Sequence, residues 1–170
     1  MRLNFASTAP GFVGRPLEQP AGSAFAKLAT HMDIGWDLDG TLLNHAAAPA
    51  LHRFIRATPR IRHVLITFRT RRRDVEPWAE LAAYRDGPQR ESFHALVFLD
   101  EAEAEGVARI ERGRRVGWWR GEDARHAEWK GRVCAKHGLT ALVDDKTHMV
   151  AAGCRRYRIE LFHPAAFMPA

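Results

Sequence analysis

Short apolar stretches alternate with helix-compatible stretches along most of this 170-residue chain, and no other feature of the sequence constrains the fold as strongly. The stretches that predict strands are Met32–Leu38, His63–Thr67, Ala95–Leu99, Arg115–Trp119, Thr140–Val143 and Tyr157–Phe162. The predicted helices are Ala46–Ala57, Asp74–Tyr84, an acidic stretch after Asp100, Asp123–Gly138, and Thr147–Ala152 with Gly153 as its end. Strands separated by helices predict a parallel sheet with helices on both faces. We therefore expect an α/β, three-layer Rossmann-like fold with a mostly parallel central sheet.

Composition and charge narrow the class of protein. Hydrophobic residues make up 46% of the chain, which excludes a disordered polymer. No apolar run approaches the ~20 residues that span a bilayer, and we expect no membrane association. The net charge of +6 favours anionic partners, either phosphorylated metabolites or nucleic acid. A general preference for arginine and alanine accounts for the charge equally well. The two cysteines lack metal-type spacing, so we expect free thiols in a cytoplasmic protein.

The sequence divides into an arm and one domain. Residues 1–31 are rich in glycine, proline, alanine and serine and show little periodicity, which predicts a poorly ordered N-terminal arm. Residues 32–170 have the length of a single domain. We expect that residues 1–30 can be deleted without loss of the fold.

The most specific motif is Asp37-Leu38-Asp39-Gly40-Thr41, where the first predicted strand ends. Side chains alternate along a strand, so Asp37 and Asp39 start on the same face, and Gly40 permits the turn that must follow. Two neighbouring carboxylates suit a hard metal ion together with a nucleophile and a general acid/base. An acidic β-turn is the competing interpretation.

Polar residues also end two other predicted strands. Thr67 follows Val64-Leu65-Ile66, and Asp144 follows Ala141-Leu142-Val143. In parallel α/β sheets, ligands bind beyond the carboxyl ends of the strands. One crevice is therefore expected to collect Asp37, Thr67 and Asp144.

With these residues in this order, the chain resembles the haloacid dehalogenase (HAD) superfamily of phosphatases over most of residues 32–162. The Asp37–Thr41 motif matches the first family motif fully, and Thr67 fits the second. Lys130 is our choice for the third motif, and Asp144-Asp145 fits the fourth. The resemblance implies a HAD-like fold and Mg²⁺-dependent hydrolysis of phosphomonoesters through an aspartyl-phosphate.

The resemblance also implies a role for each matched residue. Asp37 would attack phosphorus, and Asp39 would protonate the leaving oxygen and then activate water. The implied Mg²⁺ ligands are Asp37, the backbone carbonyl of Asp39, Asp144 and Asp145, the last either through water or as an orienter of Lys130. The implied phosphate-binding residues are Thr67 and Lys130.

Several of these residues have plainer interpretations. Thr67 suits a strand end by β propensity alone, and Asp145 suits the cap of the helix that follows. A solvated surface lysine is the competing interpretation of Lys130, with Lys136 as the alternative motif lysine. We prefer Lys130 because it lies early in its predicted helix.

The arginine run after Thr67 and a group of tryptophans suggest substrate contacts. Arg69 is the best single candidate, because arginine forks suit phosphate, although a solvated charge run accounts for the arginines as well. Trp118, Trp119 and Trp129 suit stacking on a base or sugar, but core packing is the favoured interpretation.

The expected substrate class depends on whether the chain has room for a cap domain. The windows 44–62 and 101–122 are too short for a substantial cap domain. We therefore expect an open site of the capless type, which admits a phosphorylated macromolecule or is covered by a second subunit of a homo-oligomer. The run Trp129–Lys146 is similar to 5′-nucleotidase-like members, which modestly favours nucleotide monophosphates. A polynucleotide-end phosphatase, a nucleic-acid-binding protein and a non-catalytic interaction module stay open as alternatives.

Overall fold

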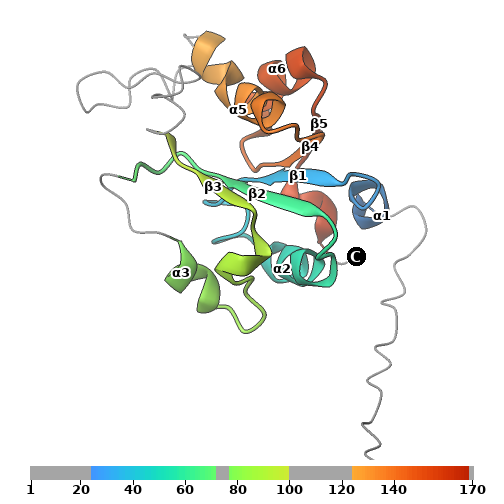
Figure 1. The fold of residues 1–170 in the computed structure, drawn as a ribbon, viewed down its shortest axis with the longest axis vertical. Coiled ribbons are helices and arrows are strands. Elements are labelled where there is room, and N and C mark those ends of the chain that lie inside the picture. Colours follow the sequence, from blue (N-terminus) through green and yellow to red (C-terminus); the bar gives the residue numbers. More distant parts are fainter. Residues whose placement is uncertain (1–23, 72–76, 100–123, 169–170) are drawn as a thin grey trace, which may run out of the picture.

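The structure is a computed structural model, and it describes residues 24–71, 77–99 and 124–168. Five strands form one sheet in the order β3-β2-β1-β4-β5, and every neighbouring pair is parallel (Figure 1). The strands are β1 (Asp33–Trp36), β2 (Arg62–Ile66), β3 (Ala95–Val97), β4 (Ala141–Val143) and β5 (Glu160–Phe162). The expected α/β, Rossmann-like fold with a parallel sheet is therefore confirmed.

Helices cover both faces of this sheet. The α-helices are α1 (Ala24–Leu28), α2 (Ala48–Ala57), α3 (Trp78–Ala82), α5 (Ala124–Lys136) and α6 (Thr147–Tyr157). Two short 3₁₀ helices are η1 (Arg90–Ser92) and η2 (Pro164–Phe167). Figure 1 shows α2 and α3 on one side of the sheet and α5 with α6 on the other. The order of layers is therefore helix, sheet, helix.

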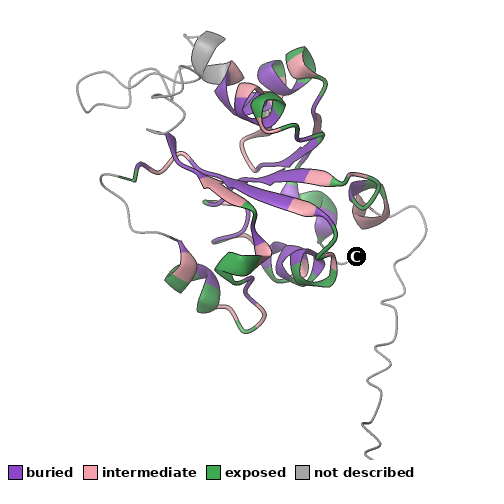
Figure 2. Cartoon of the chain, in the orientation of Figure 1, coloured by how far each residue is buried: buried purple, intermediate pink, exposed green. Residues whose placement is uncertain are grey.

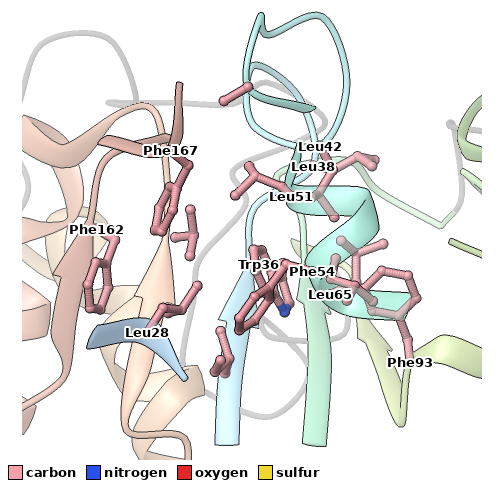
Figure 3. Packing of buried hydrophobic residues seen from close by; sticks show 14 of the residues in the cluster. Leu28, Trp36, Leu38, Leu42, Leu51, Phe54, Leu65, Phe93, Phe162 and Phe167 are labelled. Atoms are coloured by element: carbon pink, nitrogen blue, oxygen red, sulfur yellow. The ribbon is translucent and has the colours of Figure 1, made fainter. Parts of the chain in front are cut away.

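Alternation along β2 divides the core into two clusters. Leu65 packs with Trp36, Leu51 and Phe54 on the α2 side, where Figure 3 shows these side chains together. Val64 and Ile66 point to the opposite face and join the cluster under α5 and α6, together with Trp129, Val133 and Cys154. Because both faces are covered, the middle strands are apolar on both faces and buried (Figure 2).

Helix α6 differs from the sequence-based expectation. It continues through Gly153 and ends at Tyr157, where Arg158 takes a left-handed conformation (φ 59°). Gly153 lies at the contact with α5, because a Cβ there would meet Glu128 Cα at 2.8 Å. Gly131 meets the Gly153 backbone from the other helix in the same way. The glycine is thus required by close helix packing, and it does not act as a stop signal.

Part of the expected N-terminal arm is a docked helix. Helix α1 buries Leu28 completely, and Phe25 stacks on Phe54 with ring centroids 5.5 Å apart. Phe25 also meets Phe167, at 4.8 Å. The expected loop is therefore wrong for residues 24–28, because their apolar side chains complete the core. The remainder of the arm, residues 1–23, lies outside the described residues.

Other predictions have mixed outcomes. The window 44–62 holds α2, as expected, whereas the strand Arg115–Trp119, the helix after Asp100 and most of the second window lie outside the described residues. Cys134 and Cys154 are free and buried, and burial raises the pKa of both thiols. Among the described helices, none has the length and apolar character needed to cross a membrane.

Candidate active site

Three carboxylates meet at the carboxyl end of the central strands. Asp37, Asp144 and Asp145 each offer an oxygen, and these oxygens lie within 4.8 Å of one another. Asp37 follows β1, and Asp144 follows the neighbouring strand β4, which pairs with β1 through Trp36 and Val143. The Asp37 N–H donates to the Val143 carbonyl at 2.9 Å, so the pairing of the two strands brings the two acids together.

Lys130 lies between two of these acids. Its Nζ donates to Asp37 Oδ1 at 2.5 Å and to Asp144 Oδ2 at 2.6 Å. The lysine side chain is completely buried, and so is the side chain of Asp144. Helix α5 brings Lys130 to this position, whereas Lys136, in the last turn of the same helix, is exposed. Of the two lysines considered from the sequence, only Lys130 reaches the carboxylates.

Burial and charge act in opposite directions on this group. Burial, together with the negative charge of Asp144, raises the pKa of Asp37 to about 7, against the lowering effect of Lys130. Burial opposes the charge of Lys130, but Asp144 and Asp37 outweigh it and hold the pKa of the lysine above its usual range. Lys130 therefore stays a cation at neutral pH.

The turn that follows Asp37 carries Thr41, whose hydroxyl links Asp37 to Asp145. The Thr41 hydroxyl donates to Asp37 Oδ2 at 3.2 Å and accepts the Asp145 N–H at 3.0 Å. Gly40 has a φ of +83°, and a Cβ at this position would lie 2.5 Å from Asp145 Oδ2. The glycine is therefore required twice, once for the left-handed backbone and once for the space that Asp145 occupies.

Asp39 is not part of the group of three carboxylates. The sequence places it on the face of Asp37 by strand alternation, but β1 ends at Trp36, so alternation does not apply to the turn. Its carboxylate accepts two hydrogen bonds from Arg69, Nε at 2.9 Å and Nη2 at 2.7 Å. The Asp39 side chain is about half exposed. The side chains of the predicted acidic pair thus lie in different environments.

Arg69 is held from both sides by carboxylates. Besides Asp39, it donates from Nη1 and Nη2 to Glu80 of α3, the second contact at 3.0 Å. These four hydrogen bonds use four of the five N–H donors of the guanidinium. In this arrangement, Arg69 orients Asp39, and it is not free to bind a phosphate as we expected from the sequence.

The other predicted residues lie at or near this edge. Thr67 follows β2 and is fully buried, and its hydroxyl accepts the Arg69 N–H at 3.1 Å. Trp129 packs in the core against Phe68, with ring centroids 4.9 Å apart, as the favoured interpretation expected. Trp118 and Trp119 lie outside the described residues.

Asp145 has neither of the alternative roles that the sequence left open. It pairs with Lys146, and it does not contact Lys130. It also does not cap α6, whose cap position, Lys146, has no side-chain cap bond. Its Oδ1 is buried and accepts no hydrogen bond from the described residues. A buried carboxylate oxygen without a donor is costly unless a cation binds it.

The donor set fits a hard divalent cation. The grouped carboxylates Asp37, Asp144 and Asp145 form ion pairs with two cations, Lys130 and Lys146. The third carboxylate charge and the open oxygen of Asp145 suit Mg²⁺, which prefers carboxylate oxygen. Asp37, Asp144 and Asp145 would hold such an ion.

Four contacting residues were not singled out from the sequence. Thr41 and Lys146 lie within the two acidic motifs, so their positions in the sequence could have identified them as site residues. Phe68 places its ring 4.4 Å from Lys130 Nζ, a cation–π contact that only the fold reveals. Glu80 has no local signal, because it meets Arg69 through the packing of α3.

A pocket of about 490 Å³ lies along the edge strand β3. Its lining includes two aromatic rings, Trp78 and Phe93, and two arginines, Arg71 and Arg90. None of the residues of the charged network around Lys130 and Arg69 lines this pocket.

Comparisons with known proteins give the chain no family. No protein-family model matches it, and no curated protein matches it. A solved structure of a protein from the universal stress protein family of Burkholderia pseudomallei matches with a TM-score of 0.36 and 18% sequence identity, over 82% of this chain and 96% of that chain. A similarity of this size supports no statement about function.

The predicted membership in the haloacid dehalogenase superfamily is therefore wrong, and so are the capless type and the similarity to 5′-nucleotidase-like members. No protein-family model, whether of that superfamily or of another, matches the chain. The chain is assigned to the α/β, Rossmann-like fold class alone, and the chemistry of its site has to be argued from its residues.

Proposed function

We propose that this protein is a Mg²⁺-dependent phosphomonoester hydrolase that forms an aspartyl-phosphate on Asp37. The observation that carries this proposal is the placement of Lys130 between Asp37 and Asp144, next to the open oxygen of Asp145. The arrangement combines a nucleophile, a fixed cation and metal-type ligands within one group of side chains. These are the components that phosphoryl transfer requires.

Asp37 is the nucleophile. One of its oxygens accepts a hydrogen bond from Lys130 and the other accepts one from Thr41, so the carboxylate is held in one orientation. In the first step, an Asp37 oxygen bonds to phosphorus, the bond from phosphorus to the ester oxygen breaks, and Asp39 gives a proton to the departing oxygen. For this step the carboxyl group of Asp39 has to leave Arg69 and take up a proton from water. In the second step, water attacks phosphorus and Asp39 takes its proton. The bond to Asp37 then breaks, and inorganic phosphate leaves.

Lys130 supplies the fixed positive charge. It is buried and remains a cation, so it can stabilise the negative charge that develops on phosphate oxygens without reorganising at the moment of reaction. Mg²⁺ held by Asp37, Asp144 and Asp145 would neutralise phosphate charge and help an anionic nucleophile to approach an anionic ester. Thr67 stays a proposed phosphate contact at the end of β2.

Hydrolysis of p-nitrophenyl phosphate by the purified protein tests the proposal. We expect activity that requires Mg²⁺, is lost with a chelator, and is abolished in Asp37→Asn. Asp86→Asn is the matched control, because Asp86 is an exposed acid that pairs only with Arg56 among the described residues. Full activity in Asp37→Asn would contradict the assignment of the nucleophile.

The aromatic pocket favours nucleoside monophosphates as substrates. Trp78 and Phe93 offer ring faces for a base, and Arg90 adds positive charge at the same pocket. We expect Arg90→Gln to raise KM for a nucleoside monophosphate and to leave KM for glycerol phosphate unchanged. An equal change for both substrates would argue against binding of the base in this pocket.

A further inference from the structure

Two histidines lie side by side at the edge of the sheet that also carries the carboxylates. His163 follows β5 directly, and His45 lies in the segment between β1 and α2. Their ring centroids are 6.2 Å apart, with an angle of 75° between the ring planes. The residues are far apart in the sequence, so the fold brings these two rings together.

The pairing of β4 with β5 places His163 on the β5 side of the carboxylates. Val143 and Phe162 are partners in the register of these strands, and the Asp144 N–H donates to the Phe162 carbonyl at 3.0 Å. Asp144 and His163 each follow directly after one of these partners. Both residues therefore leave the sheet at its carboxyl edge, one strand apart.

Each of the two rings is held by a backbone N–H. His45 Nδ1 accepts the Ala47 N–H at 3.0 Å, and His163 Nδ1 accepts the Ala165 N–H at 3.1 Å. A ring nitrogen that accepts a hydrogen bond carries no proton, so in both rings the proton is on Nε2. Both histidines therefore present an N–H donor at Nε2, and the backbone fixes the orientation of each ring.

These two Nε2 donors have no acceptor within the described part of the chain. His163 is exposed and His45 is half-buried, so a ligand in solvent can reach both rings. Accepting the backbone N–H does not by itself require an imidazole, because asparagine, aspartate and serine are the usual residues in this role. The second nitrogen of each ring is available for a ligand.

The positions of the protons decide between an anion and a metal ion as that ligand. A metal ion needs a lone pair on Nε2, which would require the proton to move to Nδ1 and would break the hydrogen bond with the backbone. An oxyanion needs N–H donors, which are already in place, and a charged acceptor strengthens such hydrogen bonds. The two rings therefore suit phosphate or carboxylate oxygen.

We propose that His45 and His163 form a subsite for a second oxyanion group of the substrate, a phosphate or a carboxylate, beside the phosphate that is hydrolysed. This subsite rests on the proposed phosphatase activity and adds a substrate preference to it. Both rings act only as hydrogen-bond donors, so the subsite involves no proton transfer. Phosphomonoesters that carry a second oxyanion therefore bind more tightly than those that carry only one.

Three substrates with the same carbon skeleton test this preference. Glycerol 3-phosphate has no second oxyanion, 3-phosphoglycerate adds a carboxylate, and glycerol 1,3-bisphosphate adds a phosphate. In the presence of Mg²⁺, we expect KM to be about tenfold lower for a substrate with a second oxyanion, as one hydrogen bond to a charged group would give. The substrate with the larger effect identifies which oxyanion the subsite takes.

The variants His45→Asn and His163→Asn remove the Nε2 donors and keep the contacts with the backbone. The asparagine Oδ1 lies where Nδ1 lies in histidine and accepts the same N–H, whereas no atom replaces Nε2. We expect each variant to lose the tenfold advantage and to keep KM for glycerol 3-phosphate, which also shows that the variant is folded. His137→Asn is the matched control, because His137 lies between α5 and β4, at the amino end of that strand.

The outcomes separate this subsite from the proposed function. A lower KM for a substrate with a second oxyanion, lost in both asparagine variants, supports the subsite. Equal KM values for the three substrates, or an advantage that either variant retains, would overturn the subsite and leave the phosphatase proposal in place. The subsite also fails alone if the unchanged protein hydrolyses p-nitrophenyl phosphate but none of the three. If it hydrolyses no phosphomonoester in the presence of Mg²⁺, the proposed function fails, and the subsite fails with it.

Discussion

Lys130 Nζ lies 2.5 Å from Asp37 Oδ1, although the two residues are 93 positions apart in the sequence. Both side chains are almost completely removed from solvent. A buried carboxylate is strongly destabilising without a partner, so this ion pair is required by the fold as well as suited to the proposed chemistry. Structure and function therefore depend on the same contact.

Replacing Lys130 by methionine should uncover this dependence. Asp37 and Asp144 would remain buried without their shared cation, and we expect the free energy of unfolding to fall by about 3–5 kcal/mol. Mg²⁺ should restore part of the loss, since it neutralises the same carboxylates. Urea unfolding with and without Mg²⁺ measures both effects. Lys136→Met, at the exposed end of the same helix, should change neither the free energy of unfolding nor its response to Mg²⁺. Equal losses of stability in the two variants would contradict the prediction.

Gly40→Ala should weaken Mg²⁺ binding. The new Cβ would lie 2.5 Å from Asp145 Oδ2 and would displace this carboxylate. Gly138→Ala is a close control, because Gly138 also has a positive φ, of +65°, but a Cβ there meets only Arg62 Nη2, at 3.6 Å. Both variants carry a backbone cost of about 1–2 kcal/mol. Only Gly40→Ala should reduce the rise in unfolding temperature on adding Mg²⁺. An unchanged rise would show that Asp145 is not a ligand.

His63 should make stability depend on pH below neutrality. Burial lowers its pKa from 6.5 to about 4, and its ring bonds Trp36 and Thr58. Between these values the unfolded chain carries a proton on His63 and the folded chain does not. At this site the unfolded state therefore binds more protons, and the contribution of His63 to stability falls as the pH falls from about 6.5 to 4, whereas the raised pKa of Asp37 contributes in the opposite direction.

The size of this effect is at most about 3 kcal/mol, from the shift of the pKa. In denaturant unfolding across this pH range, the stability of His63→Gln relative to the unchanged protein should increase as the pH falls. His148→Gln replaces an exposed histidine of α6 and should keep the original slope. If His63→Gln kept the full slope, other groups would have to account for it.

Two truncations should separate α1 from the residues that precede it. Deletion of residues 1–23 leaves α1 in place, and we expect stability and activity to be retained. Deletion of residues 1–30 also removes Leu28 and Phe25 from the core, which costs about 1.5–3 kcal/mol for each large apolar side chain. Thermal unfolding of the two proteins distinguishes these cases. Equal stability would mean that α1 is as dispensable as the residues before it.

Local patterns were sufficient to predict the five strands of the sheet, but not the residues at which they end: β1 was expected to reach Leu38 and ends at Trp36. The residues after β1 and β4 were identified because a short apolar run followed by acids is typical of a buried strand that ends at a ligand-binding edge. The same patterns did not predict which side chains pair with each other. Asp37 and Asp39 share a motif, yet their carboxylates are bound by Lys130 and Arg69 respectively. Strand alternation could not predict this, because the strand ends before either acid.

Long-range packing accounts for the remaining differences. Gly153 has the sequence signature of a helix end, but the approach of α5 determines its role. Glu80 reaches Arg69 only because of where α3 packs, and no local pattern encodes that position. The family resemblance failed for another reason. A few motif residues in order can suggest one site without establishing common descent, and the comparisons found no such relationship.

The strand order determines which parts of the chain must come together before the site can form. β1 lies between β2, its neighbour in sequence, and β4, which comes from the far end of the chain. A chain divided between Leu99 and Ala124 would carry Asp37 on one fragment and Lys130 with Asp144 on the other. Neither fragment could then complete the buried charge cluster alone. Recovery of the proposed phosphatase activity on mixing would report the docking of β4 against β1, so this activity would measure assembly of the two fragments.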